Sequence, residues 1–126
     1  MNIVLWILQI LLAALYLWHG WLMIAPPPEV AAIMNTFLPT WFRLFIGAAE
    51  ILAAIGLILP GLTRILPWLT TLAAAGLMIV MASATVVHLS RGETSSAISA
   101  FVILLLVTFV AYMRWKVKPI AVRAVA

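Results

Sequence analysis

Long apolar runs separated by short polar breaks dominate this chain, and four of the runs are long enough to cross a lipid bilayer. An α-helix rises about 1.5 Å per residue, so roughly 20 apolar residues span a hydrocarbon core of about 30 Å. The expected spans cover about residues 3–24, 41–59, 67–88 and 97–115. They predict an all-α, polytopic membrane protein whose four transmembrane helices form an antiparallel bundle, as a single domain over residues 1–126.

Proline and small polar residues mark the breaks between the runs. The three prolines at 26–28 stop the first span, and about residues 28–38 then form a short segment expected to lie on the membrane surface. The second span is expected to end at Pro60, because proline cannot donate to the helical hydrogen-bond ladder. Polar residues 90–96 form the clearest loop of the chain.

Composition agrees with this architecture, since 67% of the residues are hydrophobic and only 8% are charged. Most basic residues lie in the second connection or at and beyond the end of the last span: Arg64, Arg114, Lys116, Lys118 and Arg123. Lysine and arginine concentrate on the cytoplasmic side of membrane proteins, so both termini are expected in the cytoplasm and residues 28–38 outside. The basic tail is therefore interpreted as a topology signal, and no nucleic-acid partner is expected.

Tryptophan and tyrosine provide a second indication of topology, because they favour the two membrane interfaces. The group expected near the cytoplasmic face is Trp6, Trp68, Tyr112 and Trp115. The group expected near the external face is Tyr16, Trp18, Trp21 and Trp41. Both aromatic belts therefore agree with the orientation that the basic residues predict.

The second span carries two charged side chains on one narrow stripe. At about 100° per residue, one face holds Arg43, Gly47, Glu50 and Ala54. An ionised side chain at the bilayer centre costs roughly 2.5 to 3.5 kcal/mol on insertion scales, so this stripe is expected to face protein. Gly47 and Ala54 would allow a neighbouring helix to approach closely.

An antiparallel bundle would bring further polar residues to the depth of this stripe. The expected intramembrane polar or ligand site comprises His19, Arg43, Glu50, Thr85 and His88. Each member also has a structural explanation: Arg43 can extend to the lipid headgroups, Glu50 can join two helices, and His88 can cap its helix. Hydroxyl side chains within the spans, Thr85 included, are expected to bond their own helix backbone.

Several kinds of chemistry are excluded or not indicated by the sequence. The chain contains no cysteine, which excludes thiol redox chemistry, iron–sulfur ligation and thiolate zinc sites. No phosphate-binding loop, metal motif or nucleophile–base pair is recognisable. No catalytic residue and no metal site is therefore predicted, and a stand-alone hydrolase or kinase is not indicated.

The segment "FRLFIGAAEILAAIGLILPG" and a third span ending in His88 resemble the DoxX-like family of small bacterial four-helix membrane proteins. The resemblance covers about residues 3–112, with Arg43, Gly47 and Glu50 as its signature. It implies a multi-pass protein of the bacterial inner membrane. It also implies a link to redox complexes, because relatives include the membrane subunit of a thiosulfate:quinone oxidoreductase. The thiol chemistry of other relatives is not implied, since this chain lacks cysteine.

Three functions stay open at this point, and the sequence favours the first of them. The first is a non-catalytic accessory or structural subunit of a larger membrane complex, with other membrane subunits or a second copy as partners. The second is a quinone-binding or proton-linked subunit of an oxidoreductase, in which Glu50 exchanges protons and Arg43 or a histidine holds a quinone oxygen. Haem held by His19 and His88 is a weaker variant of this function. The third, a small-solute or proton transporter, is disfavoured because the cytoplasmic half offers few polar residues.

Overall fold

The computed structural model describes residues 1–124, and its regular elements are all helical. They are α1 (Asn2–Ile24), α2 (Pro28–Met34), α3 (Thr40–Thr63), α4 (Trp68–Ser90), α5 (Thr94–Tyr112) and a π-helical turn η1 (Met113–Val117). Four of these, α1, α3, α4 and α5 with η1, are long and apolar enough to cross a membrane. The predicted all-α fold with four membrane-spanning helices is confirmed, and none of the residues of α2 is buried.

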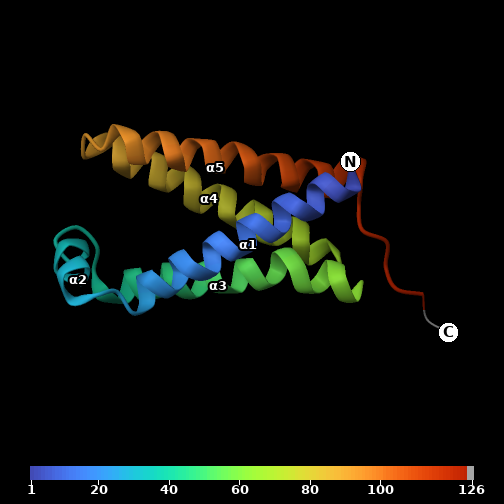
Figure 1. Ribbon diagram of the computed structural model, residues 1–126, viewed down its shortest axis with the longest axis horizontal. Coiled ribbons are helices and arrows are strands. Elements are labelled where there is room, and N and C mark those ends of the chain that lie inside the picture. The colour runs from blue at the N-terminus through green and yellow to red at the C-terminus, as the bar shows by residue number, and fades with distance from the viewer. Residues whose placement is uncertain (125–126) are drawn as a thin grey trace.

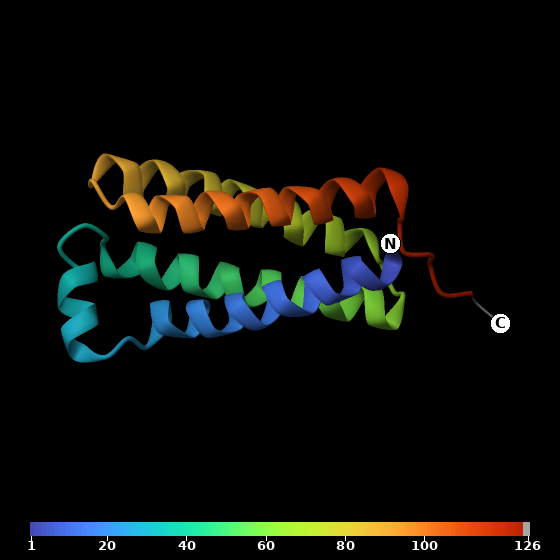
Figure 2. The same ribbon diagram turned by 45° about the horizontal axis from the view of Figure 1, so that its top comes forward.

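The spanning helices form two antiparallel pairs, α1 with α3 and α4 with α5, which are joined mainly through contacts between α3 and α4. Figures 1 and 2 both show the pairs close together near the chain termini and farther apart near α2. We call these regions the terminal end, which includes the α3–α4 turn at residues 64–67, and the α2 end, which includes the α4–α5 turn at residues 91–93. Both termini lie at the same end of the bundle, as an even number of spans requires (Figure 1).

The core follows the seam between the helices, and most of its buried side chains are apolar, although five of those described are polar or charged. Its largest buried side chains include Leu5, Leu12, Leu57, Leu77 and Val107. The outward faces are also apolar: Leu52, Ile55 and Leu59, on the face of α3 opposite the charged stripe, are all exposed. Apolar side chains on both faces are expected when the surrounding solvent is lipid.

The α4 helix is packed along only part of its length. Its buried residues are Thr70, Ala74, Leu77 and Met81, and no residue of α4 after Met81 is buried. At the α2 end, the Arg91 guanidinium lies 3.8 Å from the centre of the Phe37 ring, so a cation–π contact links the α2–α3 connection to the α4–α5 turn. The packing of α4 against the α1–α3 pair is therefore dense at the terminal end and sparse at the α2 end.

The prediction that the second span ends at Pro60 is wrong, because α3 continues to Thr63. Proline removes one backbone donor and disturbs the preceding turn of the helix. In that turn, the Gln9 side chain of α1 donates its Nε2–H to the carbonyl of Leu57 over 2.6 Å. The carbonyl that loses its donor to Pro60 is that of Gly56, one residue before Leu57, and membrane helices tolerate such a loss when neighbouring groups and small local adjustments compensate for it. The helix ends instead before Arg64, whose φ of 59° is left-handed.

The loop predicted at residues 90–96 is shorter in the structure. Thr94, Ser95 and Ser96 belong to the first turn of α5, and Glu93 occupies the N-cap position. A run of polar residues between two apolar runs is usually interpreted as a loop. The first turn of a membrane helix can also consist of polar residues, because this turn lies at the membrane surface. The fourth span consequently starts at Thr94 rather than at 97 and continues through η1.

Candidate functional site

The candidate site is built on a close crossing of α1 and α3. A side chain at Gly20 would place its Cβ 2.9 Å from the carbonyl oxygen of Gly47, and one at Gly47 would lie 2.8 Å from the carbonyl oxygen of Gly20. Two glycines facing each other let the helix backbones approach as closely as they do in other membrane bundles. Gly47 is thus at a helix contact, as its stripe predicts, and Ala54 on the same stripe is buried. Gly20 was not predicted.

This crossing brings together two of the predicted site residues, His19 and Glu50. The Nδ1 atom of His19 lies 2.6 Å from Oε2 of Glu50, a short hydrogen bond between side chains. Glu50 is almost completely enclosed, with 1% of its side chain exposed, whereas 44% of the His19 side chain is exposed. The pair therefore connects a buried carboxyl group to the outer surface of the bundle.

Arg43 lies two helical turns before Glu50 on the same stripe of α3, and it is 6% exposed. Its guanidinium does not extend to lipid headgroups; Nη1 donates a short hydrogen bond to the carbonyl of Met23. Met23 belongs to the last turn of α1, where backbone carbonyls have no partner within the helix. Arg43 thus caps α1, while its Nε has no hydrogen-bond partner among the described residues.

Tyr16 is a further polar residue of this region, and its sequence interpretation as an interfacial aromatic is wrong. Its side chain is buried in the core, one helical turn before His19 on α1. Its hydroxyl is enclosed and has no partner among residues 1–124. A tyrosine in an aromatic-rich helix end resembles an interface anchor in sequence, and only the helix packing shows that it turns inward.

Thr85 and His88, the other two predicted site residues, form no bond with the His19–Glu50 pair among the described residues. The Thr85 hydroxyl donates to the carbonyl of Met81 over 2.8 Å, which is the predicted bond to its own helix. Nδ1 of His88 lies 3.7 Å from Oε2 of Glu93 in the α4–α5 turn. Within the described chain, no hydrogen bond or ion pair joins either residue to His19, Arg43 or Glu50.

A second polar network occupies the terminal half of the bundle, and the sequence did not predict it. Arg114, interpreted above as part of the basic tail, is only 4% exposed because η1 carries it back against α1. Its Nε donates to Oε1 of Gln9 over 2.7 Å, and its Nη1 donates to Oδ1 of Asn2 over 2.7 Å and to the carbonyl of Lys118 over 3.0 Å. Gln9 continues the network to α3 through its bond to Leu57.

An apolar layer separates the two polar regions. On α1, the buried residues after Gln9 are Leu12 and Ala13, and on α3 the buried residue between Glu50 and Leu57 is Ala54. None of these side chains can relay a proton or hold water by hydrogen bonds. The arrangement therefore provides two local sites rather than one polar path along the bundle.

The His19–Glu50 pair has a defined chemical capacity. With its Nδ1–H donating to the carboxylate, a neutral imidazole keeps Nε2 as a hydrogen-bond acceptor, and a protonated ring makes Nε2–H a donor. The pair can therefore hold or release one proton beside the lipid phase. No group of three or more His, Asp or Glu side chains within residues 1–124 is arranged to hold a metal ion.

Comparison with known proteins adds one relationship. The sequence profile described as the DoxX-like family matches residues 7–110, a range that includes both His19 and Glu50. No curated protein and no solved structure matches the chain. With four membrane-spanning helices and a profile match over most of its length, this multi-pass membrane protein belongs to the DoxX-like family.

Proposed function

We propose that this chain is a small membrane subunit that binds a quinone-class molecule at His19, with Glu50 as the proton partner. The supporting observation is the unequal burial of the pair, with Glu50 at 1% exposure and His19 at 44%. A polar ring that faces lipid is unfavourable unless another group satisfies its free nitrogen. A membrane-soluble molecule with carbonyl or hydroxyl oxygens would provide that group.

The His19–Glu50 pair can bind both the oxidised quinone and the reduced quinol. Protonated His19 would donate Nε2–H to a quinone carbonyl, and the neutral ring would accept a hydrogen bond from a quinol hydroxyl. The Glu50 carboxylate, 2.6 Å from Nδ1, would stabilise the charged ring. The unpartnered Tyr16 hydroxyl lies one helical turn away and offers a second donor. In this proposal a partner protein supplies or accepts the electrons.

The proposed location is the bacterial inner membrane, with both termini in the cytoplasm and α2 outside. Support comes from the basic residues at the terminal end, which outnumber those at the α2 end. In this orientation His19 lies in the external half of the membrane, and Glu50 lies near the middle of α3. A quinone would enter sideways from the external leaflet.

A second candidate function is that of a non-catalytic structural subunit that assembles with other membrane proteins or with itself. The observation that favours it is the position of the pair on the glycine crossing of α1 and α3. In this candidate function, the His19–Glu50 bond has a purely structural role and holds together two helices that already touch at the crossing. A transport function is less well supported, because apolar Leu12, Ala13 and Ala54 separate the two polar regions.

The two candidates differ in what His19 contributes, and His88 supplies a matched control. We would place the full chain in lipid nanodiscs and follow binding of decylubiquinone by quenching of tryptophan fluorescence. The proposal expects His19→Leu to weaken binding at least tenfold, roughly the loss of one good hydrogen bond. His88→Leu should bind like the unchanged protein.

Glu50→Gln provides the second readout, because glutamine can keep a hydrogen bond to His19 but cannot take up a proton. Binding should then persist while its dependence on pH changes, because the His19 ring still takes up a proton but no longer faces a carboxylate. Unchanged affinity and pH dependence in His19→Leu and Glu50→Gln would rule out the quinone site. Lower thermal stability of His19→Leu, without any quinone binding by the unchanged protein, would support the structural subunit instead.

A further inference from the structure

The terminal end of the bundle carries an uncompensated positive charge. Its basic residues are Arg64, Arg114, Lys116, Lys118 and Arg123. The three acidic residues of the chain, Glu29, Glu50 and Glu93, lie on α2, inside α3 and before α5, so none of them is at this end. Basic side chains at a membrane surface attract anionic lipids by roughly 1 kcal/mol each. Charge complementarity therefore favours an anionic partner at the terminal end.

The chain after η1 folds back over this end as a strap, residues 118–124. The Arg64 side chain holds it by donating Nε–H to the carbonyl of Ala121 over 3.0 Å and Nη2–H to the carbonyl of Val122 over 3.2 Å. The backbone N–H of Arg123 returns a hydrogen bond of 2.8 Å to the carbonyl of Arg64. The strap therefore has a fixed position against the α3–α4 turn.

The strap and the helix ends border an open cavity of about 430 Å³ that is lined by two basic residues. Arg64 lines it from the end of α3, Lys118 from the strap, and Asn2 from the start of α1. Gly61 also lines it, and a Cβ there would lie 2.6 Å from Cδ1 of Ile120. The Ile120 side chain of the strap therefore packs directly against the backbone of α3 at Gly61.

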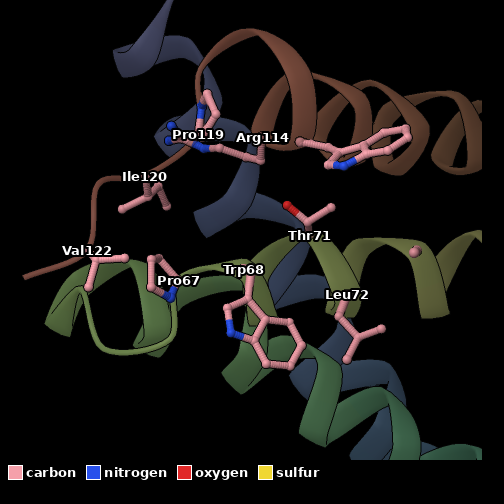
Figure 3. A pocket seen from close by; sticks show the side chains of 10 residues that line it. Pro67, Trp68, Thr71, Leu72, Arg114, Pro119, Ile120 and Val122 are labelled. Carbon is pink, nitrogen blue, oxygen red and sulfur yellow. The ribbon is translucent and has the colours of Figure 1, made fainter.

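An apolar groove of about 470 Å³ adjoins this cavity, and Pro119 and Ile120 of the strap line both. Trp68 and Leu72 of α4 line the groove on one side (Figure 3). Trp115 of η1 lines it as well, and this side chain is exposed at the bundle surface, as is Trp68. A cationic cavity next to an apolar groove with tryptophans matches the two parts of a phospholipid.

We propose that the terminal end binds one anionic glycerophospholipid, with its phosphate between Arg64 and Lys118 and an acyl chain in the groove beside Trp68 and Trp115. The buried Arg114 adds to the positive potential, since it lines the groove and its Nη2 has no partner in the described structure. Figure 3 shows its side chain extending toward Pro119, at the junction of groove and strap. The site lies far along the bundle from His19 and does not depend on the quinone proposal.

The test compares two lysines of equal charge that differ only in position. Lys118 lines the cavity, and its ammonium group has no hydrogen-bond or ion-pair partner among residues 1–124. Lys116 lies 4.2 Å from the centre of the Trp115 ring and lines neither the cavity nor the groove. The full chain would be released from nanodiscs of dioleoyl phosphatidylglycerol and, separately, of dioleoyl phosphatidylcholine. Native mass spectrometry would then count retained lipids.

The proposal expects one retained phosphatidylglycerol, little retained phosphatidylcholine, and about fivefold weaker retention in Lys118→Gln, the size expected for one basic side chain. Lys116→Gln should retain the lipid like the unchanged protein. Equal losses in both variants would show diffuse surface attraction and overturn the site, as would equal retention of both lipids. Ala75→Phe, which fills the groove without changing charge, should also reduce retention, and an unchanged level would overturn the assignment of the acyl chain.

Discussion

Two arginines are enclosed in this bundle, and each binds oxygen atoms of amides rather than a carboxylate. Arg43 donates to the carbonyl of Met23, and Arg114 donates to Gln9, Asn2 and the carbonyl of Lys118. A guanidinium stays protonated and offers five donors in a planar fork, so it can satisfy several acceptors at once. At the level of single residues, these side chains act as connectors between helices.

The first prediction concerns Arg114. Arg114→Met removes three hydrogen bonds and leaves the Gln9 and Asn2 oxygens without their donor. We expect the free energy of unfolding in bicelles, measured by titration with sodium dodecyl sulfate, to fall by about 3 kcal/mol, within the range for removing one partner of a buried charged network. Lys116→Met, which removes an exposed charge two residues away, should change it by less than about 0.5 kcal/mol. Similar losses in the two variants would contradict the network.

The second prediction concerns Glu93 in the α4–α5 turn. The Arg91 side chain, with its Nε 2.5 Å from Oε1, lowers the pKa of the Glu93 carboxyl below its ordinary value of 4.5. A lowered pKa means that the carboxylate stabilises the turn above pH 4.5, and that this contribution is lost as pH falls through the lower folded-state pKa. NMR titration of the Glu93 carboxyl carbon should show this low midpoint. In Arg91→Gln the midpoint should rise toward 4.5, and an unmoved midpoint would assign the shift to another group.

At the scale of helices, the crossing of α1 and α3 decides where the candidate site lies. The reciprocal contact of Gly20 and Gly47 sets the helix separation, which in turn places His19 within hydrogen-bond distance of Glu50. Both close contacts are to backbone oxygen atoms, which cannot rotate away as a side chain can. The position of the site therefore depends on the absence of side chains at two positions.

The third prediction tests this crossing with a matched glycine. Gly47→Ala would place a methyl group 2.8 Å from the Gly20 carbonyl oxygen, so α1 must shift, and we expect a loss of about 1 to 3 kcal/mol in unfolding free energy. Gly76→Ala on α4 meets no atom within 4 Å and should be neutral or stabilising by up to about 1 kcal/mol. Equal effects of the two substitutions on thermal unfolding in detergent would mean that the crossing is not tightly packed.

The apolar pattern predicted the helices well because length and hydropathy directly reflect the bilayer thickness. The inward direction of Glu50 was also predictable, since a charge in lipid is costly and its stripe includes Gly47.

His19 could be named as a candidate, but its pairing with Glu50 depends on the helix crossing. Arg114 was misassigned because a basic residue at the end of an apolar run looks the same whether its side chain faces water or another helix. Gly20 was missed because α1 is apolar on every side, so its sequence does not show which face meets α3.

At the scale of the whole molecule, charge is distributed asymmetrically between the two ends. The terminal end has five basic residues and no acidic side chain, whereas the α2 end combines Arg91 with Glu29 and Glu93. The enclosed position of Arg114 leaves four exposed basic residues there, so the asymmetry persists. The positive-inside rule then predicts that the terminal end faces the cytoplasm.

The fourth prediction tests this orientation, and the absence of cysteine makes the chain suitable for it. Asn35→Cys, after α2, and Ala124→Cys, in the strap, both replace exposed residues at opposite ends of the bundle. In intact cells, a maleimide that cannot cross membranes should label position 35, and position 124 should react only after permeabilisation. The reverse pattern would show that α2 lies in the cytoplasm.

Because α4 is only partly packed against protein, lipid fills part of the space around this helix. After Met81 no residue of α4 is buried, so this part of the helix packs against α5 on one side and leaves its other sides to acyl chains. Acyl chains compress and thicken with lipid composition and temperature, whereas the packed terminal end does not. The separation of the two helix pairs beside α2 is therefore expected to follow the thickness of the surrounding membrane more closely than the packing at the terminal end does.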